Sequence, residues 1–203
     1  MTETVHIAVY DTLADWETGY ASAHINKPLW HKEPGRFAVA YVGASTEPIT
    51  TAGGMRVVPD LVLAELDPQD SAMLILPGND IWNADQFVPF AEKAREFLDT
   101  GVPVAAICGA TGGLALAGLL DDREHTSNAA EYLAGVGYQG GHLYRDEPAV
   151  LDRDLITASS TAPVEFARTI LDRLDVYESS VLASWFKLYG QRDPTGFYEL
   201  MAV

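Results

Sequence analysis

A single cysteine, Cys108, stands where an apolar run meets a stretch of small residues. The run at residues 102–107 predicts a buried strand that ends at this cysteine, and the pattern at residues 109–120 predicts a helix that begins immediately after it. A nucleophile on so tight a turn needs small residues two positions to either side, and Ala106 and Ala110 meet that requirement. The chemistry that this arrangement predicts is attack by a cysteine thiolate on an electrophilic carbon.

Two interpretations of Cys108 remain open from the local sequence. At a helix N-terminus, unpaired N–H groups and the helix dipole stabilise a thiolate, so we expect the pKa of the cysteine to be lowered. The other interpretation is a small buried residue at the end of a strand, where cysteines are common. The glycines that follow do not indicate a phosphate-binding loop, because neither a Gly-Lys-Ser/Thr sequence nor Gly-x-Gly-x-x-Gly spacing is present.

The segments around Cys108 predict the elements that must position it. Apolar runs predict further strands at residues 6–10, 37–42 and 73–76, with a hairpin at 50–58 and extended pieces near 149–151 and 155–158. Helical patterns occupy residues 14–26, 88–98, 163–174 and 177–188, and residues 191–203 read as a tail. Strands that alternate with helices predict an α/β fold with a parallel sheet covered on both faces. No repeat or linker interrupts the pattern, so we expect one domain over residues 1–203.

The composition excludes several classes of protein. The 203 residues are 48% hydrophobic, which is enough for one sizeable core. Lys and Arg number 13 against 29 Asp and Glu, a net charge of −16, and so acidic a surface disfavours nucleic-acid and membrane partners. The chain has no apolar run of the roughly 18 residues that a membrane span needs, and no secretory signal pattern at its start. One cysteine cannot form an internal disulfide, so we expect a cytoplasmic protein.

No metal or cofactor is expected from the sequence. His24 and His31 are seven residues apart, but Pro28 interrupts any continuous helix that would align them. No clustered pattern of cysteines or carboxylates completes a metal site around them. We therefore expect a site that works with its own side chains on a small-molecule substrate.

Four segments of the chain resemble those of a known family. Residues 105–113 (Ala-Ala-Ile-Cys-Gly-Ala-Thr-Gly-Gly) resemble the cysteine elbow of the ThiJ/PfpI family, within the class I glutamine amidotransferase-like superfamily. Residues 14–19, residues 74–80 with their Pro-Gly turn, and residues 155–167 are similar to that family in order and spacing. The resemblance covers most of the chain. It implies a flavodoxin-like three-layer sandwich, with a mostly parallel sheet, helices on both faces and a strand–helix cysteine elbow.

The resemblance also implies roles for individual residues. Cys108 corresponds to the nucleophile, Glu17 to a carboxyl group that hydrogen-bonds its sulfur, and the backbone N–H groups of Asn79 and Gly109 to an oxyanion hole. Such a carboxyl donates a hydrogen bond only when protonated, which requires a raised pKa from burial and the adjacent thiolate. Taken without the resemblance, Glu17 is also typical of a solvated acid in the first turn of a helix. Many members of the family have a second glycine where this chain has Asn79.

The histidine that many members of the family carry is missing. Their Thr-Thr/Ser-His sequence corresponds here to Thr126-Ser127-Asn128, so that Asn128 takes the place of the histidine. An asparagine can orient groups but cannot act as a general base near neutrality. A Cys–His dyad would then require His125 after a shift in loop register, or His24 from the first predicted helix. Each of these histidines is also typical of a surface or half-buried position.

Large apolar residues supply the remaining candidates. The tryptophans Trp16, Trp30 and Trp82 lie on or near the predicted site loops, where they could line a substrate pocket or, more commonly, pack in the core or at a dimer interface. The stretch at residues 181–189 is rich in large apolar side chains and reads as a covering helix. Members of the ThiJ/PfpI family commonly dimerise, so the resemblance implies a homodimer.

The leading hypothesis is a cysteine-dependent enzyme that acts on a small electrophilic carbonyl, amide or nitrile-like substrate. The resemblance implies a hydrolase or a glyoxalase- or hydratase-type lyase, with Cys108 as nucleophile and Glu17 as its assistant. A second hypothesis is a stress-response sensor in which the lone thiol is oxidised to a sulfinate, and a third is a non-catalytic binding module. A full glutamine amidotransferase is not expected, because Asn128 removes the expected base and no synthetase domain is present.

Overall fold

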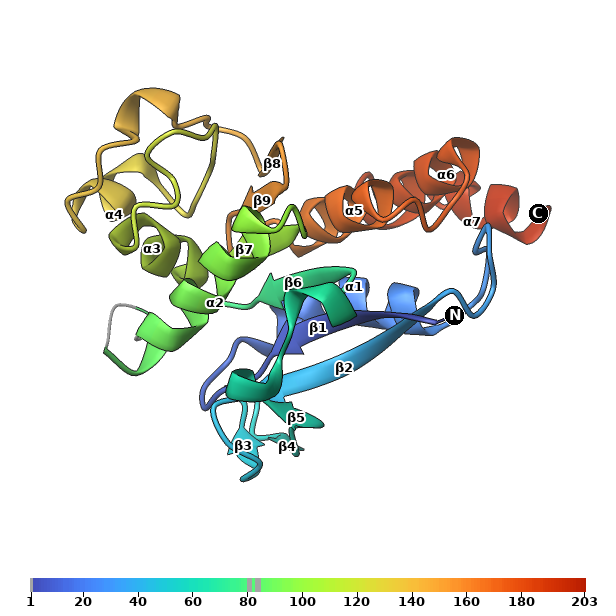
Figure 1. Ribbon diagram of the computed structural model, residues 1–203. Coiled ribbons are helices and arrows are strands. Elements are labelled where there is room, and N and C mark those ends of the chain that lie inside the picture. Colours follow the sequence, from blue (N-terminus) through green and yellow to red (C-terminus); the bar gives the residue numbers. More distant parts are fainter. Residues whose placement is uncertain (1, 80–81, 83–84) are drawn as a thin grey trace.

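The central feature of the computed structural model, which describes residues 2–79, 82 and 85–203, is a seven-stranded sheet. Its strand order is β5-β2-β1-β6-β7-β9-β8, and neighbouring strands run parallel except β8, which is antiparallel to β9 (Figure 1). The strands are β1 (Glu3–Ala8), β2 (Phe37–Gly43), β5 (Leu61–Val62), β6 (Met73–Leu76), β7 (Val104–Ile107), β8 (Ala149–Asp152) and β9 (Leu155–Ala158). A separate small hairpin pairs β3 (Ile49–Thr50) with β4 (Arg56–Val57).

Helices cover both faces of this sheet. One face is covered by α1 (Asp15–Asn26), α5 (Pro163–Arg173), α6 (Ser179–Tyr189) and α7 (Thr195–Met201), and the other by α2 (Val88–Asp99), α3 (Gly109–Leu116) and α4 (Ala130–Ala134) (Figure 1). Short 3-10 turns occupy Leu63–Glu65, Pro68–Asp70, Asp85–Phe87 and Gly141–Leu143. None of the helices in the described part of the chain is long and apolar enough to span a bilayer.

The central strands show why their sequences are continuously apolar. All four residues of β6 are buried, and successive side chains point to opposite faces of the sheet. Met73 and Ile75 join the core beneath α1, α5 and α6, whereas Leu74 and Leu76 join the core beneath α2 and α3. The prediction of a three-layer, flavodoxin-like α/β sandwich is confirmed.

Two local predictions were wrong. The helix after Cys108 ends at Leu116 rather than at residue 120, because Gly118 takes a left-handed conformation (φ 72°) that breaks the helical path. The predicted tail contains α7, whose Leu200 is fully buried. Glu199 of α7 accepts hydrogen bonds from Ser184 and Lys187 of α6, and these tertiary contacts hold a helix that lacks a strong sequence pattern of its own.

Candidate active site

Cys108 occupies the turn between β7 and α3, as predicted. Its backbone lies at φ 58° and ψ −124°, a conformation that L-residues rarely adopt, and its N–H donates to the carbonyl of Ala158 at the end of β9 (3.0 Å). The carbonyl of Cys108 accepts from the N–H of Thr111 in the first turn of α3 (3.1 Å). The half-buried thiol therefore sits at the carboxyl edge of the sheet, where ligands bind in folds of this kind.

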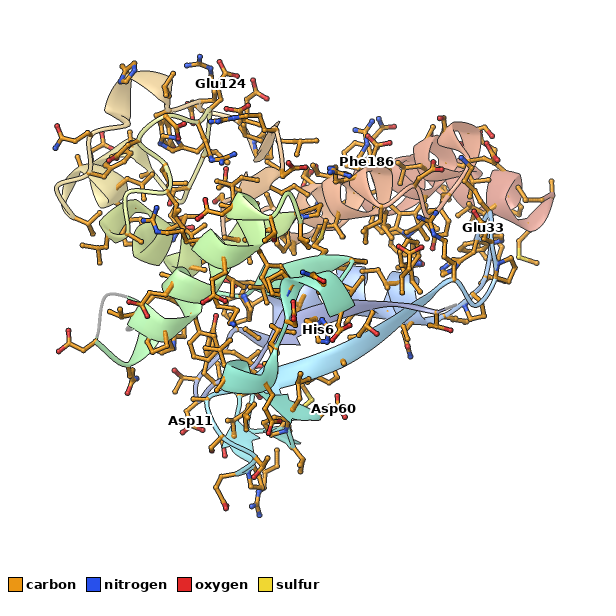
Figure 2. All side chains as sticks on the ribbon, in the orientation of Figure 1. His6, Asp11, Glu33, Asp60, Glu124 and Phe186 are labelled. Atoms are coloured by element: carbon orange, nitrogen blue, oxygen red, sulfur yellow. The ribbon has the colours of Figure 1, made fainter. Side chains whose placement is uncertain are left out.

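The loop after β6 packs directly against this turn. A β-carbon placed on Gly78 would lie 2.6 Å from Cβ of Cys108 and 2.8 Å from the backbone nitrogen of Gly109. A β-carbon on Gly109 would lie 2.5 Å from the carbonyl oxygen of Asn79. Only glycines allow this approach, so the structure brings together the Asn79 and Gly109 peptides that were predicted as an oxyanion hole. The Asn79 side chain donates to the carbonyl of Asp11 (3.4 Å), a residue labelled in Figure 2.

Glu17 lies in the first turn of α1 and is fully buried, which excludes the solvated acid that its helix position alone allows. Its Oε2 accepts a hydrogen bond from the N–H of Gly78 (2.5 Å). Its Oε1 is buried without a hydrogen-bond partner of normal geometry among the described residues, and the side chain interacts with the Cys108 thiol. Burial raises the pKa of Glu17 to about 7, against the opposing effects of the Gly78 N–H and the thiol.

The ionisation of Cys108 is coupled to that of Glu17. Burial raises the pKa of the Cys108 thiol, and negative charge on Glu17 raises it further, whereas hydrogen bonds from Asn128 and the Gly109 N–H lower it. This direction is opposite to the one that the helix N-terminus alone led us to expect, because the dipole acts on a thiol that is also desolvated and faces a carboxyl group. The two side chains therefore titrate as a pair.

Asn128 reaches the sulfur from the loop before α4. Its Nδ2 lies 3.4 Å from Sγ of Cys108 and donates a hydrogen bond to it. Its Oδ1 accepts a hydrogen bond from the backbone N–H of Ser160 (2.9 Å), in the loop between β9 and α5. An amide donor thus stands beside the nucleophile at the position where the resemblance led us to look for a histidine.

Comparison with known proteins assigns the family. A model of the DJ-1/PfpI family matches residues 3–173. The chain belongs to this family. It is 41% identical over 203 residues to the uncharacterized protease YoaZ of Bacillus subtilis, covering 98% of this chain and 97% of that protein.

Solved structures of DJ-1/PfpI proteins show the same fold. A thiJ/pfpI family protein from Bacillus anthracis is 41% identical and superposes with a TM-score of 0.93, over 100% of this chain and 97% of that one. A DJ-1 superfamily protein from Agrobacterium tumefaciens is 31% identical, with a TM-score of 0.82 over 95% and 100% of the two chains.

A glutathione-independent glyoxalase of Caenorhabditis elegans is 27% identical in sequence over 143 residues, 70% of this chain and 75% of that protein.

The two histidines that were candidates for a Cys–His dyad form hydrogen bonds elsewhere. His125 is fully buried, donates through Nδ1 to the Arg123 carbonyl (2.7 Å) and pairs through Nε2 with Tyr138 (3.0 Å). His24 lies under α6, where its Nε2 accepts from the indole of Trp185 (3.1 Å) and its Nδ1 pairs with Tyr177 (2.9 Å). Neither ring is hydrogen-bonded to Cys108, so the structure does not bring these two candidates into the site.

The tryptophans also take different places. Trp82 is buried, stacks on Phe87 and donates to the carbonyl of Pro77 and to the Tyr10 hydroxyl (2.8 Å each), so it supports the Pro-Gly turn. It also lines a cavity of about 290 Å³ between α2 and α3. Trp16 is 55% exposed and donates to the carbonyl of Ser160 (3.3 Å). Asp80, at the end of the Pro-Gly segment, lies outside the described residues.

Sequence reasoning missed two residues of the site. The Pro-Gly turn drew attention to Asn79, but Gly78 is the residue that contacts both Cys108 and Glu17. Ser160 acts through its backbone, which leaves no signal in the side-chain pattern. Within the described parts of the chain, no group of three or more His, Cys, Asp and Glu side chains could hold a metal ion.

Proposed function

We propose that this DJ-1/PfpI protein is a cysteine-dependent enzyme that acts on a small electrophilic carbonyl, amide or nitrile-like compound. A hydrolase or glyoxalase-like role is supported by relatives that are named as uncharacterized proteases, a glyoxalase and a deglycase. The observation that carries the finer proposal is the pair of Cys108 and Glu17. A fully buried carboxyl group that accepts a backbone N–H and interacts with a neighbouring thiol is arranged to exchange a proton with that thiol.

In the proposed reaction, Sγ of Cys108 forms a bond to the electrophilic carbon while the thiol proton passes to Glu17. One electron pair of the carbon–oxygen or carbon–nitrogen multiple bond moves onto the oxygen or nitrogen. The backbone N–H groups of Asn79 and Gly109 would stabilise that developing negative charge. Glu17 then returns the proton to the oxygen or nitrogen, so the adduct forms with no net loss of a proton. Because the pKa of Glu17 is about 7, the carboxyl can both accept and donate a proton near neutrality.

A second candidate function is a sensor of peroxide. The same pair supports it, since a protonated Glu17 and the Asn128 amide are both donors that a sulfinate oxygen at Cys108 would accept. Two equivalents of peroxide would oxidise the thiol to the sulfinate and leave as two molecules of water. Cys108 is the only cysteine of the chain, so no second thiol is available to form a disulfide with it.

Turnover by three proteins separates these functions. Wild type, Cys108→Ser and Glu17→Gln are assayed with a small α-oxoaldehyde, an amide and a nitrile. We expect wild type to convert at least one compound, Cys108→Ser to convert none, and Glu17→Gln to be slower by about 100-fold or more. Equal turnover by wild type and Cys108→Ser would rule the enzyme out. Absence of turnover by all three, with gain of two oxygen atoms at Cys108 under mild peroxide in the intact-protein mass, would support the sensor.

A further inference from the structure

The Asn128 side chain is held in one orientation by two hydrogen bonds. Its Oδ1 accepts from the Ser160 N–H (2.9 Å), and its Nδ2 lies 3.4 Å from the sulfur of Cys108. A flipped amide would place its NH₂ group against the N–H of Ser160, donor against donor, and would leave a carbonyl oxygen facing the sulfur. The N–H of Ser160 therefore orients the Asn128 amide so that its NH₂ group, and not its oxygen, faces the sulfur of Cys108.

Ser160 is in turn anchored on its other side. Its carbonyl accepts a hydrogen bond from the indole Nε1 of Trp16 (3.3 Å), the residue that precedes Glu17 on α1. The two anchors together tie the loop after β9 to the helix that carries the carboxyl group. The hydrogen bonds link Trp16 to the carbonyl of Ser160, the N–H of Ser160 to the Asn128 amide, and that amide to Cys108. Glu17 on α1 and Asn128 on its loop therefore both contact the sulfur from elements that are tied to each other.

Besides Asn128, the backbone N–H of Gly109 donates a hydrogen bond to the sulfur, whereas the nearby phenols donate elsewhere. Glu17 faces Cys108 from α1. The phenols of Tyr10, after β1, and Tyr132, on α4, interact with the charge of the Cys108 thiolate. The hydroxyl of Tyr132 donates to the carbonyl of Gly109 (3.3 Å), and that of Tyr10 donates to the carbonyl of Pro77. Asn128 donates its hydrogen bond to Sγ at 3.4 Å, and a neutral amide keeps that N–H at every pH at which the fold is stable.

We propose that Asn128 is a positioning residue whose amide, oriented by the Ser160 N–H and steadied through Trp16, keeps a fixed hydrogen-bond donor on the Cys108 sulfur and stabilises its thiolate. Asn128 thereby makes the contact with the sulfur that a histidine would make. Because an amide is not a base, the proton of the thiol goes to Glu17. The inference rests on the proposed function only in taking Cys108 as the reactive group. Asn128 is exposed and borders an open depression of about 420 Å³, so its side chain can be changed without disturbing a core.

The test is the pH dependence of alkylation by iodoacetamide, which reports only on Cys108 because the chain has no other cysteine. Wild type, Asn128→Ala and Asn128→Asp are followed from about pH 5 to pH 10. We expect Asn128→Ala to raise the apparent pKa of the thiol by about one pH unit, which slows alkylation about ten-fold at a fixed pH below the midpoint. Asn128→Asp removes the N–H donor and adds a negative charge beside the sulfur, so its midpoint should rise further.

Two further variants serve as controls. Asn26→Asp makes the same chemical change on an exposed asparagine at the other end of α1, about 13 Å along the helix from Glu17, and should leave the midpoint unchanged. Trp16→Phe keeps a ring but loses the indole N–H, and should raise the midpoint by less than Asn128→Ala does. An unshifted midpoint in folded Asn128→Ala would overturn the inference. If that variant does not fold, an unshifted midpoint in Asn128→Asp, which keeps an acceptor for Ser160, would overturn it equally.

These measurements are independent of turnover. If Asn128 variants shift the alkylation profile while no α-oxoaldehyde, amide or nitrile is converted, the inference stands and the proposed enzymatic function fails. If substrates are converted in a Cys108-dependent way but the pH midpoint of alkylation is the same in wild type and the Asn128 variants, the proposed function stands and the inference fails.

Discussion

Gly78 and Cys108 approach each other more closely than a side chain at position 78 would allow. A β-carbon on Gly78 would lie 2.6 Å from Cβ and 3.0 Å from Sγ of Cys108. The N–H of Gly78 also donates to the carboxyl of Glu17. One glycine after β6 therefore fixes the distance between the nucleophile and the carboxyl group, and the geometry of the pair depends on its missing side chain.

We predict that Gly78→Ala disrupts the site. The added methyl group must push apart two backbone segments, which destabilises the fold by about 1–3 kcal/mol and separates Cys108 from Glu17. The free energy of unfolding in urea and the rate of Cys108 alkylation would both change. Gly19→Ala is the matched control, because Gly19 is exposed in α1 with nothing within 4 Å of its added β-carbon. That control should stabilise the protein by up to about 1 kcal/mol through helix propensity. A Gly78→Ala protein as stable and as reactive as wild type would contradict the proposed packing.

The raised pKa of Glu17 predicts a loss of stability with rising pH. Because the pKa of Glu17 rises from 4.5 to about 7 on folding, the folded state favours the protonated carboxyl. The resulting stabilisation is complete below pH 4.5 and is lost as the pH rises toward 7, by about 3 kcal/mol in all. Glu17→Gln is neutral at every pH, so it should gain stability relative to wild type over this interval. Urea unfolding at the two ends of the interval measures the difference, and the exposed Glu92→Gln provides the control. A constant difference between wild type and Glu17→Gln would show that the carboxyl is not desolvated.

His24 predicts a pH dependence of the opposite sign. Burial is the largest cause that lowers the pKa of His24 from 6.5 to about 4, so the folded state favours the neutral ring. That stabilisation is complete above pH 6.5 and is lost as the pH falls toward 4, by about 3 kcal/mol. His24→Gln loses part of the contacts with Tyr177 and Trp185 and should be less stable at neutral pH, yet its stability should fall less steeply on acidification. Urea unfolding across the interval, with the exposed His142→Gln as control, tests this. If the free energies of unfolding of wild type and His24→Gln fall in parallel as the pH is lowered, the prediction is wrong.

The parts of the site that sequence predicted are those encoded locally. The turn at Cys108 follows from an apolar run, small neighbours and a helical pattern that are adjacent in the chain, and the strand at residues 73–76 has the predicted bounds. The position of Asn128 came from family spacing, and the structure places it against the sulfur.

The parts that sequence could not predict depend on distant partners. His24 is bound to Tyr177, 153 residues away, and His125 to Tyr138 across a loop, and neither pairing leaves a local pattern. The pKa of Cys108 went against the local expectation for the same reason. The helix N-terminus is visible in the sequence, whereas the burial of the thiol and its contact with Glu17 arise only when β1, β6 and β7 align in the sheet.

The backbone at Cys108 yields the last prediction. At φ 58° and ψ −124°, the backbone conformation costs a residue with a β-carbon about 1–3 kcal/mol, and glycine does not have this strain. Replacing Cys108 by glycine should therefore give a more stable protein than replacing it by alanine, by about 1 kcal/mol after the greater flexibility of glycine in the unfolded chain is subtracted. Ala115→Gly, a few residues along α3 where the backbone is helical, should instead destabilise by at least about 1 kcal/mol. Thermal and urea unfolding of the three variants compare the two positions. If glycine lowers the stability at position 108 relative to alanine, as it does at position 115, the backbone of the turn is not strained and the prediction is wrong. If glycine raises the stability at position 108, the strained turn that presents the thiol lowers the stability of the fold.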